Sequence, residues 1–173
     1  NDGELSERLV RVGEDLLLIH NHPEGTGLSD TDLGQLTNPG VSAIIALGHD
    51  GSVHAASLGK AFIAFQIAGP PVSVAGFESP GHTTIMTFVI SAEREVRRQR
   101  ARSFAIDEHA FLSHFHHIVS LALDEAGAIR YRSVLAGVRR DSFNRFRDEF
   151  GHIIEEARHK VAAGLRRRAT TAS

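Results

Sequence analysis

The sequence has no cysteine and no tryptophan, and only one tyrosine and one methionine among its 173 residues. Without cysteine there are no disulfides and no cysteine-rich zinc sites, so histidine and carboxylate side chains are the ligands left for zinc. The chain also lacks an apolar run of about 18 residues and a signal-peptide pattern. We therefore expect no membrane partner and a cytoplasmic location.

The charge is nearly balanced, with a net charge of −2 at pH 7 and 42% apolar residues. This balance gives no case for a general attraction to nucleic acid. Basic residues still gather in two clusters, at Arg94, Arg97, Arg98, Arg100 and Arg102 and at residues 166–168. Such runs are typical of solvated helix faces, with phosphate binding as the alternative.

The most informative stretch begins with the apolar run Leu16 to Ile19, which predicts a strand buried on both faces. Successive side chains of a strand point to opposite faces, so His20 and His22 are expected to point the same way. Pro23 ends the strand, because proline cannot continue its hydrogen-bond ladder. The pattern predicts two imidazoles side by side at a strand end.

A helix start follows the strand after a short loop that contains two glycines. Ser29 and Asp32 form an S-x-x-D pair, in which the serine caps the helix and the acid bonds back to the serine backbone. Capping alone would explain both residues. The loop also returns the chain toward the strand end, so Asp32 could join the histidines and complete the two-nitrogen, one-oxygen set of a catalytic zinc.

His20-Asn21-His22-Pro23 with Ser29-Asp30-Thr31-Asp32 resembles the H-x-H-P and S-x-x-D signature of the JAMM (JAB1/MPN+) metalloproteases. The likeness is greatest to bacterial and phage-associated JAB domains. The resemblance implies that His20, His22 and Asp32 hold Zn²⁺ and that Ser29 donates to the oxyanion of the tetrahedral intermediate. It also implies an α+β fold, a JAB/MPN-like mixed sheet with flanking helices, followed here by a helical C-terminal extension.

Two features depart from the family pattern. Six residues, 23–28, separate the second histidine from the serine, where seven are commonest in the family. The family's general base is a glutamate on a strand well upstream, and here only Glu4, Glu7 and Glu14 precede His20. Glu7 is a weak candidate, because its surroundings read as a short polar helix. We expect the N-terminal strands of the family to be missing from residues 1–91, the predicted metal-binding domain.

Further strands are predicted after the first helix. Residues 41–47 and 52–56 form a hairpin around the Asp50-Gly51 turn, with His49 and His54 at the surface. Residues 60–68 and 82–91 are each interpreted as another strand.

Residues 92–173 are predicted to be a helical extension or assembly region. One helix spans Asp107 to Leu123, ends at Gly127 and carries a histidine cluster for which no carboxylate completes a metal site: His109, His114, His116 and His117. That cluster is interpreted as helix packing or surface. A last helix begins at Asp141. Its apolar stripe predicts burial of Phe146, Phe150 and Ile154, against this chain or in a homodimer, with His152 and His159 exposed.

The function these features predict is zinc-dependent hydrolysis of amide bonds, either peptide or isopeptide. The substrate would be a protein or peptide, including a ubiquitin-like one. The alternative is a catalytically inactive MPN-like scaffold or phage-associated structural module, favoured by the absent glutamate and the helical extension. A PHP-type or amidohydrolase phosphoesterase is disfavoured, since the chain has neither the length nor the repeat of a βα barrel.

Overall fold

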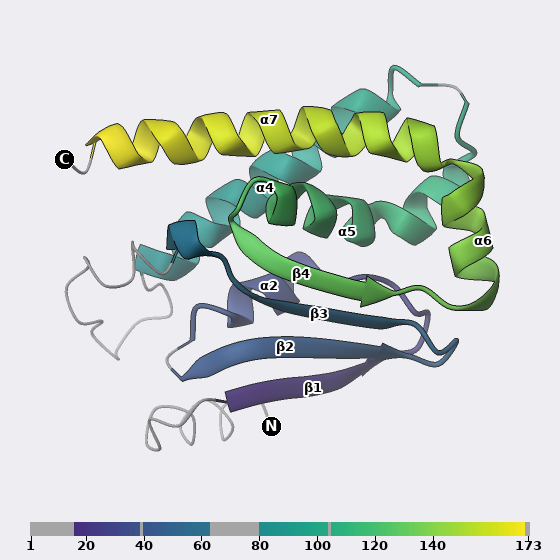
Figure 1. Cartoon of the computed structure of the whole chain (residues 1–173), viewed down its shortest axis with the longest axis horizontal. Helices are drawn as coiled ribbons and strands as arrows, with labels where there is room; N and C mark the ends of the chain where they lie inside the picture. Colours follow the sequence, from purple (N-terminus) through teal and green to yellow (C-terminus); the bar gives the residue numbers. More distant parts are fainter. Residues whose placement is uncertain (1–15, 39, 63–79, 104, 172–173) are drawn as a thin grey trace.

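The computed structural model describes residues 16–38, 40–62, 80–103 and 105–171, which form an α+β fold (Figure 1). Its elements in chain order are β1 (Leu16–His22), α2 (Asp30–Gln35), β2 (Val41–Gly48), β3 (Val53–Leu58), α4 (Pro80–Arg100), α5 (Glu108–Glu125), β4 (Ile129–Val134), α6 (Gly137–Arg145) and α7 (Arg147–Thr171). The strands make one mixed sheet, and α4, α5 and α7 lie along one side of it.

The sheet has the strand order β1-β2-β3-β4. β1 runs parallel to β2, and α2 lies in the crossover that this pairing requires. β2, β3 and β4 pair antiparallel. The predicted hairpin is confirmed, with Gly51 at φ +88° in its turn, a conformation that favours glycine.

The prediction that β1 is buried on both faces is wrong. Leu17 and Ile19 are 51% and 58% exposed, while Leu16 and Leu18, which alternate with them, are half-buried. β1 is the edge strand of the described sheet, and the helices cover the opposite face. An apolar run therefore marked a strand correctly but did not show how many of its faces are covered.

The strand predicted over 82–91 is also wrong, because these residues lie inside α4. Its threonine, isoleucine and valine residues are good strand formers, which explains the misreading. Buried Ile85, Phe88, Val89, Ala92 and Val96 instead recur three or four positions apart, the spacing of one helix face. Of the other predicted strand, residues 60–62 are helical and residues 63–68 lie outside the described part of the chain.

One core joins the sheet to the helices. The buried apolar residues form a single cluster, which includes Leu28 and Ile44 near the sheet and Phe150 and Leu165 of α7. Residues on both sides of position 91 contribute, and β4, which the sequence did not indicate, adds buried Ile129 to it. The region predicted as a helical extension thus supplies the sheet's fourth strand as well as its helices.

The region predicted as one helix from Asp141 begins earlier and consists of two helices. α6 starts at Gly137, the chain turns at Phe146, and α7 follows. Phe146, Phe150 and Ile154 are 8%, 0% and 6% exposed, which confirms their predicted burial. α7 packs on α4 and α5, so these residues are buried within one copy of the chain.

Replacing Phe150 by alanine should lower the free energy of unfolding by about 3–5 kcal/mol, because it removes a fully buried ring and leaves a cavity. Urea titration of the wild type and the variant measures this difference. Leu112→Ala is the matched control, since Leu112 is 54% exposed and its loss should cost under about 0.5 kcal/mol. Equal losses in both variants would contradict the packing described for α7.

Several histidines lie in the core. His114 and His117 are 0% and 4% exposed, which confirms helix packing for these two members of the cluster, while His152 and His159 are exposed as predicted. His54 was predicted at the surface and is instead fully buried. Its Cα pairs with that of buried Ala46, so both side chains project from the face that the helices cover.

His114 should make stability depend on pH. Its ring lies against Phe143 and Phe150, neither ring nitrogen has a hydrogen-bond partner in the described structure, and burial lowers its pKa to about 4. Above about pH 6.5 both folded and unfolded chains hold the ring neutral, so this contribution is complete. Between pH 6.5 and 4 only the unfolded chain binds the proton, and stability falls by up to about 1.4 kcal/mol per pH unit.

His114→Phe should therefore flatten the fall in unfolding free energy between pH 6.5 and 4.5. Chemical denaturation at several pH values measures that slope. Leu112→Ala, which changes an exposed side chain that does not titrate, should leave the slope unchanged. His117, whose pKa burial lowers to about 3, keeps part of the acid sensitivity in both variants. A wild-type slope in His114→Phe would rule out this role.

Candidate metal centre

The two histidines of the H-x-H motif lie together at the end of β1, as their spacing predicts. Their Nε2 atoms are 2.8 Å apart, and their ring centroids are 4.7 Å apart. In the neighbouring strand, His20 pairs with Ala46 and His22 with Gly48. These small residues leave room on that face of the sheet for two imidazole rings.

The S-x-x-D pair begins α2 as a complete capping box. The Ser29 hydroxyl accepts a hydrogen bond from the Asp32 backbone N–H at 3.2 Å. Asp32 Oδ2 accepts from the Ser29 backbone N–H at 2.7 Å and from its hydroxyl at 2.8 Å. The carboxylate of Asp32 is thus fixed by the same bonds that start the helix.

The capping box places this carboxylate against both histidines. Asp32 Oδ1 lies 3.1 Å from His20 Nε2, and Oδ2 lies 3.3 Å from His22 Nε2. Within the described ranges, these three residues are the group of histidine and acidic side chains that could share a metal ion, with ligand atoms within 4.8 Å of one another. The structure brings together all three residues predicted as ligands.

The donor set suits a zinc ion. Tetrahedral zinc with bonds of about 2.0–2.2 Å separates its ligand atoms by about 3.3–3.6 Å. The two Nε2 atoms are 2.8 Å apart, with Asp32 Oδ1 3.1 Å from His20 and Oδ2 3.3 Å from His22, so the rings would have to move outward to share one ion with a single carboxylate oxygen. Two nitrogens and one carboxylate oxygen leave a fourth position for water or substrate.

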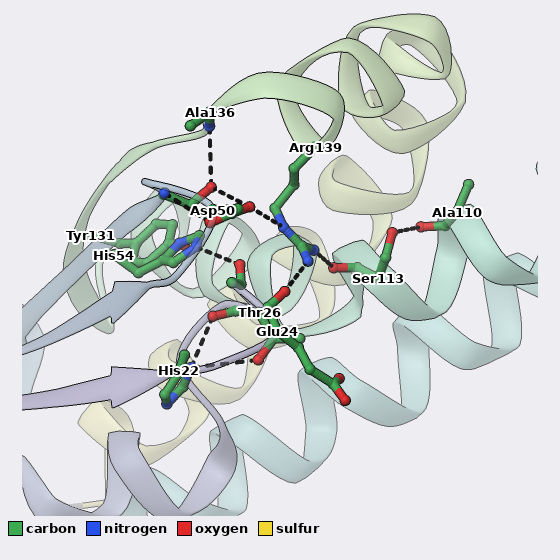
Figure 2. A network of polar contacts seen from close by, with 12 residues as sticks. His22, Glu24, Thr26, Asp50, His54, Ala110, Ser113, Tyr131, Ala136 and Arg139 are labelled. Atoms are coloured by element: carbon green, nitrogen blue, oxygen red, sulfur yellow. Dashed lines mark hydrogen bonds and ion pairs between the residues drawn. The ribbon is translucent and has the colours of Figure 1, made fainter.

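A contact beyond the ligands orients His22. Its Nδ1 lies 2.9 Å from the Thr26 carbonyl oxygen, which can only accept, so Nδ1 carries the proton (Figure 2). Nε2 then presents its lone pair to the metal position, the arrangement common for metal-bound histidines. The side chains of His22 and Asp32 are 14% and 16% exposed and that of His20 is 36% exposed, so solvent reaches the site from the His20 side.

The loop after the histidines packs tightly on α5. A Cβ at Gly27 would lie 2.7 Å from the backbone nitrogen of His117, so glycine permits this approach. The contact brings His116 near the site. Burial lowers the pKa of His116, although the charges of Asp30 and Asp32 act in the opposite direction. The sequence predicted packing or surface for His116 and did not place it beside the predicted metal ligands.

A second acid, Glu93 on α4, lies near the start of α2. Burial raises its pKa, the charge of Asp30 raises it further, and Arg97 opposes both effects. Only the packing of α2 on α4 reveals this neighbour, because no motif in the sequence marks it. The upstream acids Glu4, Glu7 and Glu14 lie outside the described residues.

Comparison with known proteins finds no match to a family model, to a curated protein or to a solved structure. None of the helices in the described ranges combines the length and hydropathy that crossing a bilayer requires.

His20→Ala and His22→Ala should each weaken Zn²⁺ binding by more than about 100-fold, a larger loss than removal of an outer hydrogen bond causes. Calorimetric titration measures the affinity, and circular dichroism shows that each variant is folded. His49→Ala is the control, since His49 is exposed in the β2–β3 turn. Unchanged zinc uptake by His20→Ala would exclude this centre.

Proposed function

We propose that the chain is a zinc-dependent hydrolase of amide bonds, peptide or isopeptide, built on a JAB/MPN-like sheet. The observation that carries this proposal is the convergence of His20 Nε2, His22 Nε2 and the Asp32 carboxylate at 2.8–3.3 Å. A strand end supplies the nitrogens and the first turn of a helix supplies the oxygen, as the resemblance to the JAMM signature implies. The substrate class we infer is a protein or peptide, including a ubiquitin-like protein.

When bound, zinc supplies Lewis acidity that polarises a carbonyl and lowers the pKa of a coordinated water. The chain's own residues hold and orient the ion. Thr26 fixes the tautomer of His22, and Ser29 fixes the rotamer of Asp32. The more exposed His20 side is where a scissile carbonyl would enter.

Ser29 combines a structural role with the proposed catalytic one. Its hydroxyl proton is directed at Asp32 Oδ2, so donating to an oxyanion requires the hydroxyl to rotate away. Asp32 Oδ2 would still accept the Ser29 backbone N–H at 2.7 Å, so its orientation would survive that rotation. The serine can therefore serve the reaction without releasing the metal ligand.

Ser29→Ala separates these two roles. Loss of an oxyanion donor should lower turnover by about 100- to 1,000-fold, and loss of the cap should lower the unfolding free energy by about 1 kcal/mol. Zinc affinity should change much less than turnover. Cleavage of a fluorogenic peptide and of linked ubiquitin by zinc-loaded protein measures turnover, with Ser29→Thr, which keeps a hydroxyl, as the matched variant.

The assay also distinguishes the two functions that the sequence suggests. Zinc binding without cleavage of either substrate would favour the inactive MPN-like scaffold. If Ser29→Ala keeps wild-type turnover, Ser29 has no catalytic role and only caps the helix. The resemblance places the general base upstream of His20, so Glu7→Gln belongs in the same series, and unchanged turnover there would exclude Glu7.

A further inference from the structure

Arg139, on α6, reaches the loop that follows the metal-binding histidines (Figure 2). Each of its three guanidinium nitrogens donates to a different segment. Nε donates to Asp50 Oδ2 at 3.2 Å in the β2–β3 turn, Nη1 to the Ser113 carbonyl on α5, and Nη2 to the Glu24 carbonyl in the loop. The side chain of Arg139 is 14% exposed, so the segments it contacts cover most of it.

The loop is held at three consecutive carbonyl groups, each by a side chain from a different element. The pairs are Glu24 with Arg139 of α6, Gly25 with His54 of β3, and Thr26 with His22 of β1. The third of these bonds is the one that orients a metal ligand. The position of the Thr26 carbonyl, which bonds to His22, therefore depends on the path of the loop at Glu24 and Gly25.

The middle contact depends on a buried hydrogen-bond chain. His54 Nε2 donates to the Gly25 carbonyl at 3.3 Å, so its Nδ1 accepts from the Tyr131 hydroxyl at 2.6 Å. The Tyr131 oxygen in turn accepts from His117 Nδ1 at 2.9 Å. Burial lowers the pKa of His54 and keeps its ring neutral. Among the three side chains that bond to the loop, arginine is the one that always carries a charge.

Asp50 provides the matching negative charge. Burial raises its pKa, but hydrogen bonds from Ser52 and the ion pair with Arg139 outweigh burial and lower it below its usual value. Asp50 also lies directly against the loop, since a Cβ at Gly25 would come within 2.5 Å of its carboxylate oxygen. The Asp50–Arg139 ion pair thus lies against the loop at Gly25, the residue that follows Glu24.

We propose that Arg139 is a positioning residue of the metal centre. It fixes the Glu24 carbonyl and thereby the path of the loop to Thr26, whose carbonyl orients His22 toward the ion. The proposal rests on the metal site proposed above. Arginine suits the task because its planar, five-donor fork reaches three segments at once, which the single ammonium of lysine cannot reproduce.

The test compares Co²⁺ binding by the full chain and by Arg139→Ala and Arg139→Lys. We expect the alanine variant to bind Co²⁺ about 10- to 100-fold more weakly, the range seen when outer-shell partners of a ligand are lost, and the lysine variant to lie in between. The visible absorption of bound Co²⁺ should also change, because the His22 ring is less well fixed. Added guanidinium, but not methylammonium, should restore part of the affinity of Arg139→Ala.

A second readout does not depend on metal. Amide hydrogen exchange over residues 22–29 should become faster in both Arg139 variants, while exchange in α7 stays unchanged. The Gly25 amide, which donates to the His22 carbonyl at 2.9 Å, is the most direct reporter. If Arg139→Ala is poorly folded, Arg139→Lys and this local measurement decide the question.

Two control variants separate positioning from general destabilisation. Arg158→Ala removes an arginine that pairs with Glu125 of α5 away from the loop, and Ile153→Val loosens the core. Both should retain wild-type Co²⁺ affinity and spectrum. Wild-type affinity, spectrum and loop exchange in the folded Arg139 variants would overturn the positioning role alone, whereas absence of Co²⁺ binding by the wild type would overturn the proposed metal centre itself.

Discussion

The hydrogen bonds between Ser29 and Asp32 are the interaction on which the rest of the site depends. They begin α2, the helix that lets the chain cross from β1 to its parallel neighbour β2. The same bonds hold the Asp32 carboxylate 3.1 Å from His20. Asp32 is thus both a helix-capping residue and a proposed metal ligand, and its bond from the Ser29 backbone N–H holds it even when the hydroxyl turns away. This double use ties the geometry of the site to the topology of the sheet.

The parts of the site that could be predicted from the sequence are those fixed by neighbours along the chain. The common direction of His20 and His22 follows from the two-residue period of a strand, and the approach of Asp32 follows from the capping pattern. The hairpin after α2 followed from Asp50-Gly51. In each case the residues that determine the geometry lie within a few positions of one another.

The parts that escaped prediction depend on contacts between distant segments. β4 is a short strand, and its partner β3 precedes it in the sequence by a long segment that includes α4 and α5. His54 is buried because helices that come later in the chain cover its face of the sheet. The bond from Arg139 to Glu24 spans 115 positions, and nothing in the sequence around either residue indicates it. The extent of burial of β1 is likewise a property of the sheet edge and not of its apolar run.

The long separation in sequence between Arg139 and Glu24 also affects the order of folding. The three residues proposed as metal ligands are synthesised almost together, and bringing them into contact closes a short loop at low entropic cost. The docking of α6 must close a far longer loop, and long-range contacts of this kind form slowly. A chain emerging from the ribosome exposes the complete ligand set before Arg139 has been made. An ion captured at that stage would be held by a mobile loop, and its exchange would become slow only when the C-terminal half of the fold closes.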